Sequence, residues 1–160
     1  MGFCTRLLSD WFNAAQNILH DPELKPEITL FDNTYGYKEM LLESGITFYS
    51  FCEHHLVPFF GKAHIACFPQ HQVVGLSKLN RMVQCLARKP RVQERLTLEI
   101  GSELQAALQT EDIAVVVQAT HLCIAARGVE DPGSMTRTSH FGARIEEREI
   151  KNEFLRQIES

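Results

Sequence analysis

This sequence lacks a segment that could span a membrane, because no apolar run approaches the roughly eighteen residues that a spanning helix needs. It also lacks a basic surplus. Its 16 lysines and arginines stand against 20 acidic residues, and this net charge of −4 argues against general nucleic-acid binding. Its five cysteines are an odd number with no secretory leader before them, so a disulfide framework is not expected. These features predict a cytoplasmic protein whose thiols are free or bound to metal.

Internal repeats and low-complexity linkers are absent as well. A chain of 160 residues with 44% hydrophobic and 22% charged residues is typical of one globular domain with a single core. We therefore predict one domain over residues 1–160.

The hydrophobic periodicity predicts an α+β fold with an antiparallel sheet, because strands come in sequential pairs with helices grouped between them. Residues 21–44 are interpreted as loops and turns. Gly101 falls inside an expected helix, where only close packing would explain it. The expected helices cover Thr5 to Leu19, Ser77 to Arg88, Val92 to Leu108 and Glu149 to Ile158. The expected strands cover Ile46 to Phe51, Lys62 to Phe68, Ile113 to Ala126 and Thr136 to Ile145.

Two short polar stretches carry the ligands of a candidate metal site. Cys52 and His55 have the C-x-x-H spacing that lets a tight turn aim sulfur and imidazole at one point. His121 and Cys123 are two residues apart, so on a strand both would leave the same face. Three such ligands suit a catalytic zinc ion, and a fourth would close a structural site. Any one of them could instead be an ordinary buried residue, but the joint pattern favours metal.

Five motifs follow one another in a fixed order. They are Cys-Glu-His-His-Leu-Val-Pro-Phe from Cys52, Gly-Leu-Ser-Lys-Leu-Asn-Arg from Gly75, Val-Gln-Glu-Arg-Leu-Thr from Val92, Ala-Thr-His-Leu-Cys from Ala119, and Ala-Arg-Gly from Ala126. In this order they resemble the motifs of the GTP cyclohydrolase I family. The resemblance runs from about Ile28 to the C-terminus. It implies a tunnelling fold, with an antiparallel sheet carrying helices on one face and subunit sheets joining into a barrel. The family forms ring-shaped homo-oligomers, for which we expect a decamer.

The resemblance also implies a reaction and assigns the residues. GTP and water would become 7,8-dihydroneopterin triphosphate and formate, the first step toward folate or another pterin. Zn²⁺ would be held by Cys52, His55 and Cys123. His121 would protonate the opening base, and His54 would shuttle protons near neutral pH. Ser77 would assist opening of the ribose.

Some of the residues assigned to substrate binding could also be ordinary charged residues near the starts of helices. The resemblance assigns Ser77, Lys78, Arg81 and Arg127 to the triphosphate and Gln93 and Glu94 to guanine. Cations in the first turn of a helix oppose its dipole, which favours an anion-binding role, although solvated surface charge is the alternative. Glu94 could be no more than a carboxylate favoured near a helix start.

The N-terminal region, about residues 1–27, is expected to be shorter than is usual in the family. Arg6 there aligns with a phosphate-binding arginine once a one-residue gap is allowed. Cys4, Cys67 and Cys85 match no ligand position and are interpreted as buried thiols.

Two further hypotheses remain open. One is a zinc-bearing pterin- or nucleotide-binding homologue without full turnover. The other is the related nitrile reductase of deazaguanine metabolism, which uses a cysteine nucleophile and NADPH.

Overall fold

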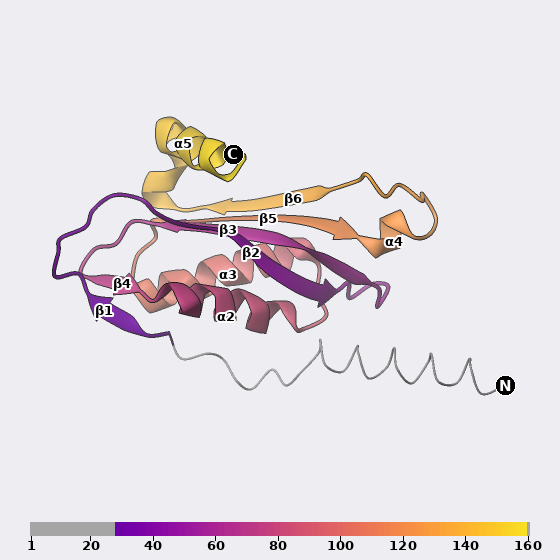
Figure 1. The fold of residues 1–160 in the computed structure, drawn as a ribbon, viewed down its shortest axis with the longest axis horizontal. Coiled ribbons are helices and arrows are strands. Elements are labelled where there is room, and N and C mark those ends of the chain that lie inside the picture. The colour runs from indigo at the N-terminus through magenta and orange to yellow at the C-terminus, as the bar shows by residue number, and fades with distance from the viewer. Residues whose placement is uncertain (1–27, 160) are drawn as a thin grey trace.

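The computed structural model describes residues 28–159, which form an antiparallel sheet between helical layers (Figure 1). The expected helix from Thr5 to Leu19, with Cys4 and Arg6, lies outside the described residues. The main sheet has four strands in the order β2-β3-β5-β6, and a smaller sheet pairs β1 with β4. The strands are β1 Leu30–Asp32, β2 Leu41–Phe51, β3 Pro58–Cys67, β4 Gln72–Val74, β5 Ile113–His121 and β6 Thr136–Phe141. The helices are α2 Leu76–Ala87, α3 Gln93–Leu108, α4 Leu122–Ala125, the 3-10 turn η1 Ala143–Glu146 and α5 Arg148–Glu159.

Strand β5 lies at the centre of the fold. Its first five residues, Ile113 to Val117, are all buried, so both faces of the sheet are covered there. A strand buried on both faces needs a continuous apolar run, which the Ile-Ala-Val-Val-Val sequence supplies. Alternate residues of this run enter two separate hydrophobic clusters, one on each side of the sheet.

Helices α2 and α3 cover one face of the sheet, as predicted. The expected stripe of Leu79, Met82, Val83 and Leu86 is buried on α2, and α3 buries Leu96, Ile100 and Leu104. This periodicity of three and four residues is what turns one side of a helix toward a sheet.

Helix α5 packs on the opposite face, so the expectation that all helices lie on one face is wrong (Figure 1). Phe154 is fully buried, and Ile150 and Ile158 pack around it as the sequence predicts. Their partners include Ala66 and Ala114, which leave their strands on the side away from α2 and α3. Small alanine side chains leave room there for a helix to approach the sheet.

Three other expectations needed correction. The strand expected from Ile113 to Ala126 ends at His121, where α4 begins. The strand expected to reach Ile145 ends at Phe141 and is followed by η1. Strand β1 and the start of β2 occupy part of residues 21–44, which were interpreted as loops and turns. Among residues 28–159, no helix is both long and apolar enough to cross a bilayer.

Gly101 in α3 lies against His140 of β6. A Cβ atom at Gly101 would lie 2.5 Å from Cδ2 of His140, far inside van der Waals contact. We therefore expect Gly101→Ala to lower the free energy of unfolding by roughly 1–2 kcal/mol through overpacking, although alanine favours a helix by about 1 kcal/mol.

The same substitution should become neutral or stabilising when His140 is also replaced by alanine, because the obstructing ring is gone. Thermal midpoints of the wild type, the two single variants and the double variant at one protein concentration measure this. Stabilisation by Gly101→Ala beside an intact His140 would contradict the packing argument.

Candidate metal centre and active site

Cys52 and His55 lie in the tight turn that joins β2 to β3. The backbone N–H of Cys52 donates to the carbonyl of Val57 (3.0 Å), and the N–H of Leu56 donates to the carbonyl of Cys52 (2.8 Å). Leu56 takes a left-handed conformation, with φ of 51°. The turn brings Sγ of Cys52 within 3.7 Å of Nδ1 of His55, so the C-x-x-H spacing does converge as predicted.

Cys123 completes the trio from the segment that follows β5, the neighbour of β3 in the sheet. One ligand atom from each of Cys52, His55 and Cys123 lies within 4.8 Å of the other two. Cys123 reaches this position from α4, not from a strand as predicted. The helical turn changes its direction relative to His121, which remains the last residue of β5.

The chemistry of the trio fits a thiophilic divalent cation. Burial raises the pKa of Cys123, and the charge of the neighbouring Cys52 thiol raises it further. Two thiolates so close together repel each other, and a cation between them would remove this penalty. Two sulfurs and an imidazole nitrogen are ligands that suit zinc, and three protein ligands leave a position for water or substrate.

His121 is held beside the trio by its neighbours on both sides. Its ring stacks on Phe59, its direct partner across the β3–β5 pair, with centroids 4.7 Å apart and planes 2° from parallel. Its Nε2 lies 2.7 Å from Oε1 of Gln93. Burial lowers the pKa of His121, while the nearby Glu94 carboxylate opposes this effect. The imidazole is therefore mainly neutral at pH 7.

The hydrogen bonds of Gln93 determine which nitrogen of His121 carries the proton. Nε2 of Gln93 lies 3.1 Å from three acceptors, namely the carbonyl oxygens of Val117 and Thr136 and the hydroxyl of Thr138. The amide oxygen must therefore face His121 and accept from it. Neutral His121 then holds its proton on Nε2, which leaves Nδ1 as the basic nitrogen.

Gln93 is almost completely buried, with 1% of its surface exposed. Thr97 extends its network, since the Thr97 hydroxyl lies 2.6 Å from that of Thr138 and also donates to the carbonyl of Gln93. In this structure the Gln93 amide binds protein groups, and its assignment to guanine stays a prediction. Glu94, next to it, is exposed.

Other predicted residues also lie near the trio. The charge of Arg127 acts on Cys123 and lowers its pKa, against the larger effect of burial. The ring of His54 lies 6.1 Å from that of His55 and is exposed at the surface of the turn. The structure thus brings together the three ligands, both candidate proton carriers, Glu94 and Arg127.

Ser77, Lys78 and Arg81 lie elsewhere. Ser77 and Lys78 occupy the first turn of α2, whereas Arg81 falls one turn later than predicted. The turn that holds Cys52 and His55 is close to the other end of this helix, where the α2–α3 connection meets β2 (Figure 1). A helix of 12 residues is roughly 18 Å long, so one chain holds these groups far from the trio.

Two neighbours of the site were missed from the sequence. Phe59 stacks on His121, and its position one residue after Pro58 looks like ordinary strand sequence. Arg91 is a charged residue with only 3% of its surface exposed, and nothing in its sequence context signals burial. Both depend on contacts between segments far apart in the chain.

The chain is similar throughout to proteins of one kind. The family model described as GTP cyclohydrolase I matches residues 6–159. A GTP cyclohydrolase 1 from Flavobacterium johnsoniae is 51% identical over 138 residues, which are 86% of this chain and 62% of that protein. A GTP cyclohydrolase 1 from Aquifex aeolicus is 47% identical over 133 residues, covering 82% of this chain and 72% of the relative. The chain therefore spans less than two thirds of the first relative's length.

Proposed function

Because this chain belongs to the GTP cyclohydrolase I family, we propose that it converts GTP and water to 7,8-dihydroneopterin triphosphate and formate. The observation that carries this proposal is the convergence of Cys52, His55 and Cys123 beside His121. Such an arrangement combines a metal-binding trio with a positioned proton carrier, which hydrolytic opening of a purine ring requires.

Zn²⁺ is the cofactor that Cys52, His55 and Cys123 would hold. When bound, it would act as a Lewis acid and lower the pKa of a coordinated water to roughly 7. Cys52 is buried, whereas His55 is exposed to solvent. The side of the trio formed by His55 therefore remains open to substrate.

His121 would move the proton that ring opening needs. Its Nε2–H is held by Gln93, so the ring cannot rotate freely and Nδ1 is the atom that takes up and releases a proton. A pKa held below its usual value keeps much of the imidazole neutral, so it can accept a proton and pass it to a ring nitrogen of the base. Exposed His54 would exchange protons with solvent beside it.

Glu94 would read the guanine base. A carboxylate can accept two parallel hydrogen bonds, from N1–H and from the exocyclic amine, and adenine offers no such pair. The carboxylate is exposed, and its charge already acts on His121, so a base bound to it would lie beside the proton carrier.

The triphosphate would be bound by the start of α2 on a second copy of the chain. Within the described residues, no side chain caps this helix start and no acidic residue lies in its first turn, so its positive end is available to an anion. Ser77, Lys78 and Arg81 lie too far from the trio in one subunit. We therefore propose a homo-oligomer in which neighbouring chains complete each site.

The test is incubation of the zinc-loaded protein with GTP while formate and the fluorescent oxidised pterin are followed together. Both products should appear in equal amounts, and a chelator should stop them. A folded, zinc-loaded oligomer that forms neither product would instead support a binding protein without turnover. Reduction of a nitrile with NADPH would support the third hypothesis.

Replacing Glu94 with glutamine should weaken GTP binding and leave zinc in place. Charge-assisted hydrogen bonds are worth about 1.5–3 kcal/mol, so we expect the affinity to fall roughly 10- to 150-fold. Titration of GTP into the zinc-loaded protein measures this. Glu147→Gln, an exposed carboxylate beyond β6, is the control and should bind GTP normally. Equal affinities in both variants would remove Glu94 from guanine recognition.

A further inference from the structure

We propose that Arg91, through its ion pair with Glu99, is a positioning residue that holds the Cys52 turn in the geometry for metal binding. This inference rests on the proposed zinc site. Arg91 lies in the connection between α2 and α3, outside the trio and outside the groups that meet substrate.

The backbone of Arg91 forms hydrogen bonds with the residues on both sides of Cys52. Its N–H donates to the carbonyl of Phe51 (2.9 Å), and its own carbonyl accepts from the N–H of Glu53 (3.4 Å). These two bonds engage the residues immediately before and after the ligand. Any shift of Arg91 would therefore move the main chain on both sides of Cys52.

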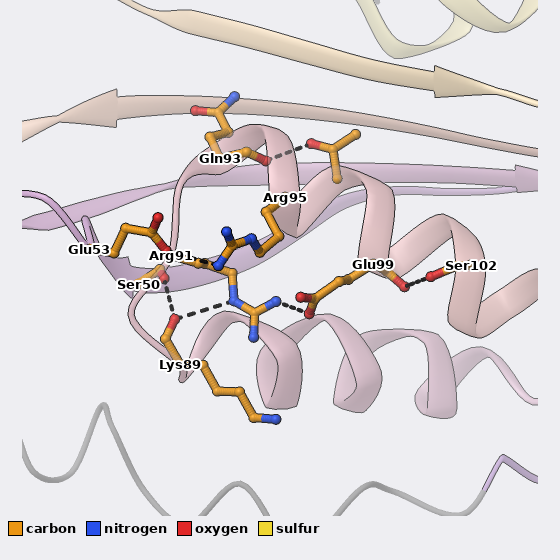
Figure 2. Close-up of polar contacts among 9 residues, drawn as sticks. Ser50, Glu53, Lys89, Arg91, Gln93, Arg95, Glu99 and Ser102 are labelled. Carbon is orange, nitrogen blue, oxygen red and sulfur yellow. Dashed lines mark hydrogen bonds and ion pairs between the residues drawn. The ribbon is translucent and has the colours of Figure 1, made fainter.

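The side chain of Arg91 ties this segment to α3. Its Nη1 forms an ion pair with the carboxylate of Glu99, and its Nε donates to the carbonyl of Lys89 (3.3 Å) (Figure 2). The hydroxyl of Ser50, two residues before the ligand, donates to the same carbonyl (3.4 Å). The guanidinium is almost fully buried, whereas Glu99 is 39% exposed.

The same stretch of chain also holds His121. Gln93 follows Arg91 by two residues and binds the His121 ring. The short segment from Arg91 to Gln93 is thus bonded to the Cys52 turn at one end and to the proton carrier at the other. The ion pair of Arg91 with Glu99 on α3 therefore fixes the positions of Cys52 and His121 relative to each other.

A second ion pair near the turn provides the matched comparison. Arg95, in the first turn of α3, pairs with Glu53 of the turn at 3.2 Å, but its side chain is 59% exposed (Figure 2). Exposed pairs contribute little because water and salt screen them, whereas groups that orient metal ligands are typically worth about 10- to 100-fold in metal affinity. Burial therefore distinguishes the two arginines.

The test measures the zinc dissociation constant by competition with a chromophoric chelator. Arg91→Met should weaken zinc binding roughly 10- to 100-fold, and Glu99→Gln, which keeps the shape of the side chain, should weaken it in the same direction. The double variant should bind no more weakly than Arg91→Met, because both residues act as one unit. Visible spectra of the Co²⁺-loaded proteins should show altered coordination in these variants.

Two controls separate positioning from general destabilisation. Arg95→Gln should change the zinc dissociation constant by less than about twofold, as expected for an exposed pair. Ile100→Val, in the buried face of α3, should lower the thermal midpoint without changing zinc affinity or the Co²⁺ spectrum.

Unchanged zinc affinity in both Arg91→Met and Glu99→Gln would overturn the inference, as would an equal loss in Ile100→Val. If Arg91→Met does not fold, Glu99→Gln decides alone. A wild-type protein that binds no zinc would overturn the proposed function together with this inference, which distinguishes that failure from a failure of positioning alone.

Discussion

Replacing Cys123 with serine is expected to remove zinc and cyclohydrolase activity together. Cys123 is one of the three ligands proposed for zinc, and a serine hydroxyl is a poor zinc ligand because it stays protonated at neutral pH. With two ligands left, the trio no longer meets the minimum of a catalytic zinc site. We expect less than about one tenth of the wild-type zinc content after dialysis, and turnover reduced at least about a thousandfold.

Metal analysis and the formate assay on the same samples measure both effects. Cys85→Ser is the matched control, because Cys85 lies on α2 and is not one of the three residues whose ligand atoms converge, so its replacement should leave the zinc content unchanged. Full zinc in the Cys123→Ser protein would show that the ligand assignment is wrong. Full turnover without zinc would contradict the metal-dependent reaction itself.

Replacing His121 with asparagine is expected to abolish most turnover while zinc stays bound. His121 is a proton carrier in this proposal and not a ligand, so its loss should cost the chemical step. General acid–base groups typically contribute 10²- to 10⁴-fold, and we expect kcat to fall by about that factor. This corresponds to roughly 3–5 kcal/mol of transition-state stabilisation.

The effect on kcat, compared with the effect on the thermal midpoint, distinguishes a proton carrier from a packing residue. The ring of His121 also stacks on Phe59, so a purely structural role would lower the thermal midpoint and leave kcat nearly unchanged. Phe59→Leu removes the stacked ring while keeping His121, and it should retain much more activity than His121→Asn. Loss of zinc from His121→Asn would show that the residue supports the metal site directly.

Local patterns predicted the buried stripes of the helices and the convergence of two of the three candidate metal ligands. The stripes on α2, α3 and α5 are set by the geometry of the helix itself, so the spacing of apolar residues was enough to place them. The convergence of Cys52 and His55 was predictable for the same reason, because three residues of turn allow few arrangements.

The remaining parts depend on which segments meet in space. Residues 122–125 are apolar enough for a strand or a helix. They form α4 because the sheet ends at His121, and this helical turn changes the direction of the Cys123 side chain. The face chosen by α5 depends on small residues such as Ala66 and Ala114 on strands far away in the sequence. Periodicity within one element contains no information about either choice.

The sequence by itself determined which side chains are available for the proposed chemistry, since the thiols of Cys52 and Cys123 and the imidazoles of His55 and His121 are groups that suit metal binding and proton transfer. Only the tertiary structure decided how they are held and which groups one subunit can supply. It placed Arg91 against the Cys52 turn, oriented Gln93 toward His121, and left Ser77 and Lys78 at the far end of α2. The physical reason is that residue type and spacing act over a few residues, whereas these contacts join segments tens of residues apart and exist only once the sheet and helices have packed.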